Sequence, residues 1–381
     1  MLTNYFVDPG GGSDVTGGGT IGTPWATVQH ALDTITRDTT NGDQINLKSG
    51  TADVLAAPLD LTTYGTPTAT APLVLRGYTS AANDGGMGEI DCGGATMWAS
   101  ASYDYLILAD LEMHTFGDNT GLDLDNNLIL YRCEIHKGAS TPSNKNLVNI
   151  DSDCQVIGCY IHDTGSSNVA ALDLNSFGNV FGNYIVPGAD NSGGCISGGN
   201  DYAIVGNILV CDHTGARGII AGFSGFNGLV MHNIVYNSAA GTGGGVVIAN
   251  QTAGYSPVMN NIICGWSGAG GEGVLASADL GLAGWNAFYN CTANYTITGN
   301  QIIDLTANDV ALAADPFTDA ANGDFSLTTA AKAALASKGW PTSYLGAHAN
   351  TVSNLNIGPI QMAAGGGGAS IYRRVARLLG G

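Results

Sequence analysis

Apolar residues recur in a fixed pattern along residues 108–288: an apolar residue, two further residues, a residue that is usually Asn or Cys, one more residue and a second apolar residue. Successive instances lie 22, 26, 24, 24, 26, 28 and 25 residues apart. The eight instances are Leu108–Met113, Leu130–Ile135, Val156–Ile161, Val180–Ile185, Ile204–Leu209, Val230–Val235, Val258–Ile263 and Ala283–Phe288. One coil of this length cannot bury its own apolar face, so the repeat predicts stacked coils of about 25 residues, a parallel β-solenoid.

A second set of strands repeats in phase with the first. Residues 122–125, 148–151 and 172–175 alternate apolar and polar positions, and they are offset by 26 and then 24 residues. Strict alternation places the apolar side chains inside and the polar ones on the outer face. The outward rows are therefore predicted to hold Asp123, Asn149 and Asp173, and beside them Asp125, Asp151 and Asn175.

Asparagine occupies the fourth position of the repeat in its last five instances. An Asn in a turn tolerates the left-handed conformation, and its amide can hydrogen-bond to the Asn of the next coil. The residues Asn183, Asn207, Asn233, Asn261 and Asn286 are therefore predicted to form a structural ladder.

The two ends of the chain differ from the repeat. Residues 23–35 predict a helix, with Thr23 as N-cap and Pro24 in the first helical position, which would close the N-terminal end of the apolar core. The predicted organisation is an N-terminal cap at 1–42, β-helix coils at 43–305, a C-terminal cap at 306–361, a Gly-rich linker at 362–369 and a basic amphipathic helix at 370–381.

Several segments carry a resemblance to a known family: Tyr5–Asp14, Trp25–Gln29, Asp315–Phe317 and Gly323–Phe325. With the repeat, they make residues 4–361 resemble the pectin-lyase-like superfamily of right-handed parallel β-helix proteins. The resemblance implies an all-β, single-stranded right-handed parallel β-helix. It implies no single activity, since this fold hosts lyases, hydrolases, epimerases, viral tailspikes and inert structural proteins.

The sequence departs from the catalytic members of that superfamily. It contains no Gly-His-Gly and no adjacent Asp-Asp, as polygalacturonase-like members have, and its few Arg residues do not fit the pattern of pectate lyases. The chain accordingly resembles viral structural, tailspike-type members more than catalytic ones.

Composition and charge narrow the possible partners. The chain has 12 Lys and Arg against 31 Asp and Glu, a net charge of −19, which repels phosphate backbones and anionic lipid. We expect neither a nucleic-acid nor a membrane partner.

The start of the sequence lacks the basic and apolar regions of a signal peptide, so we expect synthesis in the cytoplasm and function on a virion or at an extracellular surface. The eight cysteines form no C-x-x-C pair and are interpreted as buried thiols.

Four carboxylates on three adjacent coils form the first candidate site. Neighbouring rungs lie about 5 Å apart and next-but-one rungs about 10 Å apart, which brackets the carboxylate separations of glycosidases. The candidate catalytic residues are Asp123, Asp125, Asp151 and Asp173. The same oxygens suit Ca²⁺, for which Asp125 and Asp151 are the candidate ligands, although no cofactor is required. The alternative is a solvated face with no ligand.

A histidine column forms the second candidate site. His114, His136 and His162 each follow an inward apolar residue, so they should face outward in register. Imidazoles on adjacent rungs beside Glu112 and Glu134 suit a divalent transition metal or acid–base chemistry. The alternative is a purely structural stack.

Outward aromatic residues along the same column form the third candidate site. Tyr160, Tyr184 and Tyr236 could stack on sugar rings, or they could pack against loops.

The last residues predict a docking element that follows four consecutive glycines. Because a lone helix of about ten residues is marginal in water, its apolar stripe should bury itself on a second subunit or a larger particle such as a capsid or tail. The candidate docking residues are Ile371, Arg373, Arg374, Val375, Arg377, Leu378 and Leu379.

Two functions fit these patterns. The first is a non-catalytic structural or adhesive β-helix, a virion surface, decoration or tail component that contacts glycans. The alternative is a polysaccharide lyase or glycoside hydrolase that acts on an extracellular polysaccharide.

Overall fold

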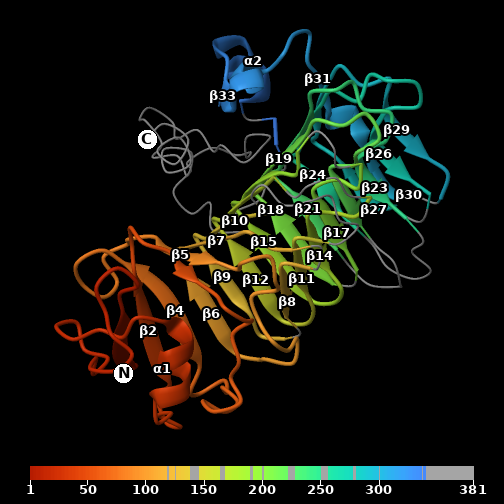
Figure 1. Ribbon diagram of the computed structural model, residues 1–381. Helices are drawn as coiled ribbons and strands as arrows, with labels where there is room; N and C mark the ends of the chain where they lie inside the picture. Colours follow the sequence, from red (N-terminus) through yellow and green to blue (C-terminus); the bar gives the residue numbers. More distant parts are fainter. Residues whose placement is uncertain are drawn as a thin grey trace. The chain divides into compact units, whose positions relative to one another are not determined.

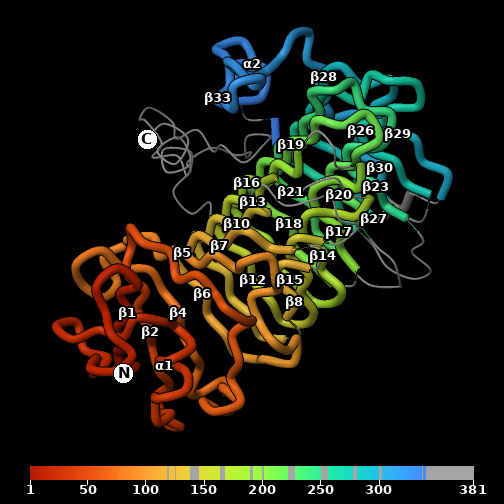
Figure 2. The backbone as a smooth tube through the Cα atoms, viewed as in Figure 1, coloured from red at the N-terminus to blue at the C-terminus, as the bar shows by residue number. Residues whose placement is uncertain are grey.

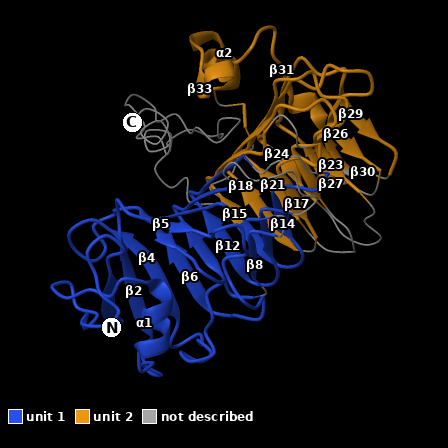
Figure 3. Cartoon of the chain, in the orientation of Figure 1, with its two compact units in different colours: residues 1–179 blue, residues 180–381 orange. Residues whose placement is uncertain are grey.

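The structure is a computed structural model of a chain built almost entirely from short parallel strands. It describes residues 1–117, 120–124, 126–137, 146–163, 168–188, 192–199, 201–221, 228–249, 256–277, 280–299, 301–336 and 338–339. The chain divides into two compact units, residues 1–179 and residues 180–381 (Figure 3). In each unit a full coil contributes one strand to each of three parallel sheets, which we call sheets 1, 2 and 3 (Figure 1). This arrangement confirms the predicted all-β right-handed parallel β-helix, with coils of about 26 residues.

Unit 1 contains the first coils of each sheet. Its sheet 1 consists, in hydrogen-bonded order, of β1 (Thr3–Val7), β2 (Asp43–Lys48), β4 (Leu73–Tyr78), β6 (Leu106–Ala109), β9 (Ile129–Tyr131) and β12 (Cys154–Ile157). Its sheet 2 consists of β3 (Asp53–Val54), β5 (Gly88–Asp91), β7 (Leu111–His114), β10 (Glu134–His136) and β13 (Tyr160–His162). Its sheet 3 consists of β8 (Leu122–Leu124), β11 (Val148–Ile150) and β14 (Leu172–Leu174). The strand β15 (Gly178–Phe181) spans the division between the units.

The register within unit 1 is the one that the apolar repeat predicts. Met113 pairs with Ile135, and Ile135 pairs with Ile161, so the inward residues of sheet 2 form one column. All three side chains are fully buried. The tube in Figure 2 shows the coils of this unit stacked in succession. Stacking therefore turns each inward position of the repeat into a continuous apolar column.

Unit 2 repeats the same three-sheet coil. Its sheet 1 consists of β18 (Tyr202–Val205), β21 (Leu229–Met231), β24 (Val258–Met259), β27 (Leu280–Gly284) and β30 (Gln301–Leu305). Its sheet 2 consists of β16 (Tyr184–Val186), β19 (Ile208–Cys211), β22 (Ile234–Asn237), β25 (Ile262–Cys264), β28 (Ala287–Tyr289) and β31 (Val310–Ala311). Its sheet 3 consists of β17 (Ile196–Gly198), β20 (Ile219–Ala221), β23 (Gly244–Ile248), β26 (Glu272–Ala276) and β29 (Ala293–Ile297).

The asparagines of unit 2 form the predicted ladder. The side-chain amide of each donates to the side-chain oxygen of the next, at 2.9 Å from Asn183 to Asn207 and at 3.0 Å from Asn207 to Asn233. The ladder continues at 3.0 Å to Asn261 and at 3.1 Å to Asn286. Each accepting oxygen also receives the backbone N–H of the preceding asparagine. The ladder therefore satisfies polar groups that the apolar core would otherwise leave unpaired.

The predicted backbone conformation of these asparagines is wrong. The left-handed conformation falls on the residue that precedes each of them, and the five asparagines themselves are not left-handed. The preceding residues and their φ values are Gly182 (64°), Gly206 (72°), His232 (57°), Asn260 (57°) and Trp285 (54°). The turn is completed before the asparagine, so that its side chain enters the buried ladder.

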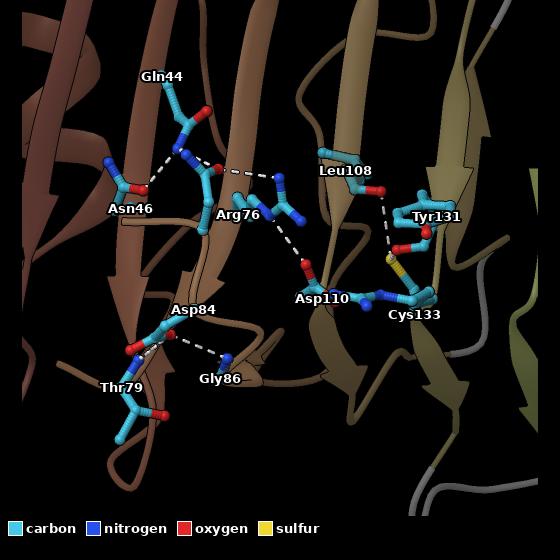
Figure 4. Close-up of polar contacts among 12 residues, drawn as sticks. Gln44, Asn46, Arg76, Thr79, Asp84, Gly86, Leu108, Asp110, Tyr131 and Cys133 are labelled. Atoms are coloured by element: carbon cyan, nitrogen blue, oxygen red, sulfur yellow. Dashed lines mark hydrogen bonds and ion pairs between the residues drawn. The ribbon is translucent and has the colours of Figure 1, made fainter. Parts of the chain in front are cut away.

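The same corner in unit 1 is held by a buried carboxylate. Asp110, left-handed at φ 53°, contacts the guanidinium groups of Arg76, at 2.8 Å, and of Arg132 (Figure 4). Asp110 is buried, and both arginines are partly exposed. A buried carboxylate needs such partners, because an unpaired charge in the interior is strongly unfavourable. The ion pairs therefore tie three consecutive strands of sheet 1 at this corner.

The N-terminal helix begins later than predicted. α1 spans Val28–Thr34, and its N-cap is Thr27, whose side chain accepts a backbone N–H of the first turn. Trp25, inside the predicted helix, instead forms a parallel bridge with Val7 at the end of β1. That pairing uses the backbone groups that a helix from Thr23 would need, so the later threonine caps the helix.

The C-terminal region forms a small antiparallel hairpin after the last coil. Beyond η1 (Thr306–Asn308), β32 (Phe317–Asp319) pairs with β33 (Asp324–Leu327) around η2 (Ala320–Asn322), and α2 (Thr329–Leu335) follows. The predicted linker at 362–369 and docking helix at 370–381 lie outside the described residues.

The cysteines agree with the sequence-based interpretation as buried thiols. All eight cysteines are free thiols, and all except the partly buried Cys291 are buried. Among the described residues, no helix is long and apolar enough to cross a membrane.

Candidate functional site: a histidine–glutamate ladder

Two rows of ionisable side chains run across sheet 2 of unit 1. The strands β5, β7, β10 and β13 alternate between buried and outward residues, and each strand contributes one outward residue to each row. The first row consists of Glu89, Glu112, Glu134 and Tyr160. The second row consists of Asp91, His114, His136 and His162. We call the three glutamates and three histidines of these rows the His–Glu ladder.

Each histidine of the His–Glu ladder contacts the glutamate of the preceding coil. The Nε2–Oε1 distance is 3.0 Å from His114 to Glu89 and 3.3 Å from His136 to Glu112. It is 3.0 Å from His162 to Glu134. The contacts therefore run diagonally between the two rows and link neighbouring rungs.

The imidazole rings also face outward in register, as predicted, and stack on one another. The ring centroids of His114 and His136 lie 5.4 Å apart, and those of His136 and His162 lie 4.7 Å apart. Tyr160 adds a further ring, at 4.0 Å from His162 and inclined by 17°. The ring of Tyr160 therefore continues the stack of imidazoles, with its face against that of His162.

The residue after a histidine orients its second ring nitrogen. Nδ1 of His162 lies 2.8 Å from a carboxylate oxygen of Asp163, and Nδ1 of His114 lies 2.7 Å from the hydroxyl of Thr115. Both Asp163 and Thr115 are left-handed, with φ values of 45° and 57°. These turns bring the second contact to Nδ1 and leave Nε2 directed at the glutamate.

The ladder contacts shift the pKa values of two members. The hydrogen bond from His136, supported by the charges of the neighbouring imidazoles, lowers the pKa of Glu112. Burial opposes protonation of His162, but hydrogen bonds to Glu134 and Asp163 outweigh it and raise the pKa of this histidine. The arrangement favours an imidazolium beside a carboxylate, which is a proton donor next to its acceptor.

Two groups of the His–Glu ladder have the geometry to hold a metal ion. In each group the three ligand atoms lie within 4.8 Å of one another. Within the part of the chain that the structure describes, these groups are Glu89 with Glu112 and His114, and Glu134 with His136 and His162.

The predicted carboxylate patch of sheet 3 has a different character. Asn149 lies between Asp123 and Asp173 in the register, and its amide donates to Asp123 at 2.7 Å. Asp173 accepts from the amide of Asn146 at 2.8 Å. Asparagine amides therefore engage the two carboxylates of this row.

The contacts of the other two carboxylates of that patch do not test calcium binding, which stays a prediction. Asp151 is partly exposed and lies 3.4 Å from the hydroxyl of Ser152. Asp125 lies outside the described residues. These contacts accordingly do not test whether the patch catalyses a reaction or binds Ca²⁺. The patch consists of Asp123, Asp125, Asp151 and Asp173.

The three predicted sugar-stacking tyrosines have different surroundings. Tyr160 is partly exposed at the end of the His–Glu ladder. Tyr184 is buried, with its ring 6.2 Å from that of Phe325, and Tyr236 packs on Phe317 and Phe325 at 6.0 and 5.5 Å. The C-terminal hairpin therefore covers part of the two later rings, which favours the packing alternative for them.

Two charged residues in or beside the His–Glu ladder are absent from the sequence-based predictions. Glu89 belongs to a strand that precedes the recognised repeat, although Glu89-Ile90-Asp91 has the same polar, apolar, polar order as Glu112-Met113-His114. Lys137, which follows His136, is fully buried. A charged residue directly after a ladder histidine gives no sequence signal that it is buried, because burial of Lys depends on its tertiary partners.

Comparison with known proteins supports the fold and leaves the activity open. No family profile and no curated protein matches the sequence at a significant level. The crystal structure of pectate lyase Pel9A is similar with a TM-score of 0.53 and 14% identity, over 95% of this chain and 96% of that chain. A rhamnogalacturonan lyase gives a TM-score of 0.41 at 14% identity, over 87% of this chain and 98% of that chain. The GH136 lacto-N-biosidase from Eubacterium ramulus gives 0.40 at 12% identity, over 81% of this chain and 68% of that chain. The match to pectate lyase Pel9A supports the parallel β-helix fold, which hosts many activities.

Proposed function

We propose that this protein is a non-catalytic, glycan-contacting β-helix that works at a virion or extracellular surface. The observation that carries the proposal is the partly exposed ring of Tyr160, which stacks on His162 beside a row of carboxylates and imidazoles. An aromatic face offers apolar contact to a sugar ring, and the adjoining polar row offers hydrogen-bond donors and acceptors to its hydroxyl groups.

The repetitive chemistry of the ladders supports binding more than cleavage. A glycosidase needs two carboxyl groups whose environments differ, so that one is protonated and the other is charged. The three His–Glu contacts repeat one arrangement, and amides engage Asp123 and Asp173. Such rows favour many weak, similar contacts along an elongated ligand.

Cleavage of an extracellular polysaccharide by a lyase or glycoside hydrolase is the second candidate function. The hydrogen-bonded pair of His162 and Glu134, with its raised histidine pKa, favours it, because such a pair can donate and accept a proton near neutral pH. The fold shared with a pectate lyase is compatible with this candidate but does not select it.

A panel of acidic and neutral polysaccharides tests both candidates in the same samples. The full chain is incubated with each polysaccharide, and binding, new reducing ends and new unsaturated ends are measured. We expect saturable binding to at least one polysaccharide without new ends. New ends of either kind would support the second candidate and contradict the first, and absence of both binding and cleavage would contradict both.

Attachment to a larger particle through the C-terminal residues is part of the same proposal. The net charge of −19 and the cluster of arginines at 373–377 favour an acidic surface, either of a second copy or of a capsid or tail, as the partner.

Deleting residues 365–381 is expected to leave the solenoid folded and to lower the oligomeric state or the retention on the particle. The deleted residues follow the β-helix and its cap in sequence, so the apolar columns stay intact. Light scattering and co-sedimentation measure the result. If the truncated chain behaves like the full chain in both, the docking role is wrong.

A further inference from the structure

We propose that Glu134, His136 and His162 form a binding site for one divalent transition-metal ion, of the type of Zn²⁺. The proposal does not depend on glycan binding, since it rests on the ligand atoms of β10 and β13 alone. Two imidazoles and one carboxylate are a donor set that suits zinc, which binds nitrogen and oxygen ligands in a tetrahedron.

The spacing of the ligand atoms fits such an ion. Ligands at about 2.0–2.1 Å from a tetrahedral zinc lie about 3.3 Å from one another. Nε2 of His162 lies 3.0 Å from Oε1 of Glu134, and the ligand atom of His136 lies within 4.8 Å of both. Zinc could therefore take the place of the hydrogen bond between His162 and Glu134, with a movement of at most about 1.5 Å by His136.

The contact of Asp163 completes the arrangement expected of a metal-binding histidine. Its carboxylate lies 2.8 Å from Nδ1 of His162, so Nδ1–H can donate to Asp163 while Nε2 carries the free electron pair. Metal-binding histidines usually donate their second N–H to a carboxylate or carbonyl, which fixes the tautomer and the ring orientation. The left-handed turn at Asp163 thus positions the carboxylate that orients the ring of His162.

The site is open to ions from solvent. The side chains of His136, His162 and Glu134 are 18%, 13% and 21% exposed, so each is held in place by packing while one side stays accessible. Water or a ligand hydroxyl can fill the fourth position of a zinc tetrahedron, as in sites with three protein ligands.

The related group of Glu89, Glu112 and His114 serves as an internal comparison. It offers one imidazole and two carboxylates, whereas the proposed site offers two imidazoles and one carboxylate. Zinc prefers nitrogen over carboxylate oxygen ligands more than Mg²⁺ or Ca²⁺ does, so the proposed site should be the tighter of the two.

Titration of the full chain with ZnCl₂ in a calorimeter tests the assignment. We expect saturable binding, weakened about tenfold or more by His136→Asn, His162→Asn or Glu134→Gln, because each removes one of three ligands. His114→Asn tests the second group, and His213→Asn, at a partly exposed histidine outside both groups, is the matched control. The His213→Asn variant should retain the tight site within about twofold. The His114→Asn variant should also retain the site, with a larger change in affinity because its ring stacks on that of His136.

A second measurement separates loss of the site from loss of the fold. Co²⁺ bound in the proposed tetrahedral site should give intense visible absorption in the wild type and in the His114→Asn variant, and none in the His162→Asn variant. Thermal melts of all variants without metal should stay cooperative. Absence of saturable zinc binding, equal loss in the His213 variant, or abolition by His114→Asn with retention in His162→Asn would overturn the proposal.

Discussion

In the coils that carry the apolar repeat, a left-handed residue turns the chain from sheet 1 into sheet 2. In unit 1 this residue is Asp110, Arg132 or Gly158, with φ values of 53°, 55° and 63°. The left-handed conformation is unfavourable for Asp and Arg, and glycine adopts it without strain. The ion pairs of Asp110 with two arginines offset this cost where glycine is absent.

The end of the asparagine ladder shows the same dependence on single residues. Asp309 occupies the place of a further asparagine: its carboxylate accepts the backbone N–H of Asn286 at 2.8 Å and interacts with the hydroxyl of Tyr295. Burial, together with the neighbouring Asp304, raises the pKa of Asp309 to about 6. The folded protein therefore binds the proton of this carboxyl more tightly than the unfolded chain does.

The raised pKa of Asp309 predicts a specific pH dependence of stability. Its contribution is fully present below the unfolded value of about 3.8 and is lost as the pH rises through about 6. Asp309→Asn keeps an acceptor for Asn286 and removes the charge, so it should raise stability near pH 7 by about 1 kcal/mol, a value discounted for partial exposure.

Thermal melts of wild type and Asp309→Asn between pH 4 and pH 7 measure this effect. The two curves should converge at the acidic end and separate toward neutral pH. Asp324, which is exposed, provides the control through Asp324→Asn. A wild-type protein whose stability rises between pH 4 and pH 6 relative to the Asp309 variant would contradict the assignment.

At the scale of strands, the sequence predicts the register because the alternation has a period of two. A shift by one residue would expose Ile135 and Ile161 and bury Glu134 and His136, so only one register is compatible with a buried core. The placement of the His–Glu ladder in adjacent rows follows from the same period.

The features that the sequence did not predict depend on contacts between distant residues. The start of α1 is set by the pairing of Trp25 with Val7, which no local pattern reveals. Gly182 and Asn183 both tolerate a left-handed backbone, so the local sequence does not show which of them adopts it. Gly182 is the left-handed residue, because the side chain of Asn183 hydrogen-bonds to Asn207 of the next coil. Glu89 was missed because the early coils differ in length from the repeat.

Two isoleucines of neighbouring strands in the same coil test the register directly. Ile161 is fully buried on β13, whereas Ile157 points outward at the end of β12 and is partly exposed. Ile161→Asp should destabilise the protein by about 4 kcal/mol or more, because it places an unpaired charge in the apolar column.

The matched variant Ile157→Asp should have a much smaller effect, since its carboxylate reaches water. Chemical denaturation of both variants gives the comparison. Equal destabilisation of the two, or no effect of Ile161→Asp, would show that the inward and outward positions have been exchanged.

At the scale of the whole molecule, a repeat fold supplies rows of similar groups. Parallel strands about 4.8 Å apart repeat each outward side chain at that interval, as the His–Glu ladder and the asparagine ladder do. Rows of this kind suit an elongated ligand with repeating units, because several weak contacts act together on one chain. The acidic net charge favours neutral polysaccharides over strongly anionic ones.

The most direct test of glycan contact compares two tyrosines of unit 1. Tyr160 lies at the end of the His–Glu ladder, and Tyr131, on sheet 1, is 36% exposed and outside the proposed surface. Binding of the polysaccharide selected from the panel is measured for wild type, Tyr160→Ala and Tyr131→Ala, with new chain ends measured in the same samples. The account predicts about a tenfold loss of affinity in the Tyr160 variant alone, without new ends in any sample. Unchanged affinity in the Tyr160 variant, equal loss in both variants, or release of new ends by the wild type would contradict it.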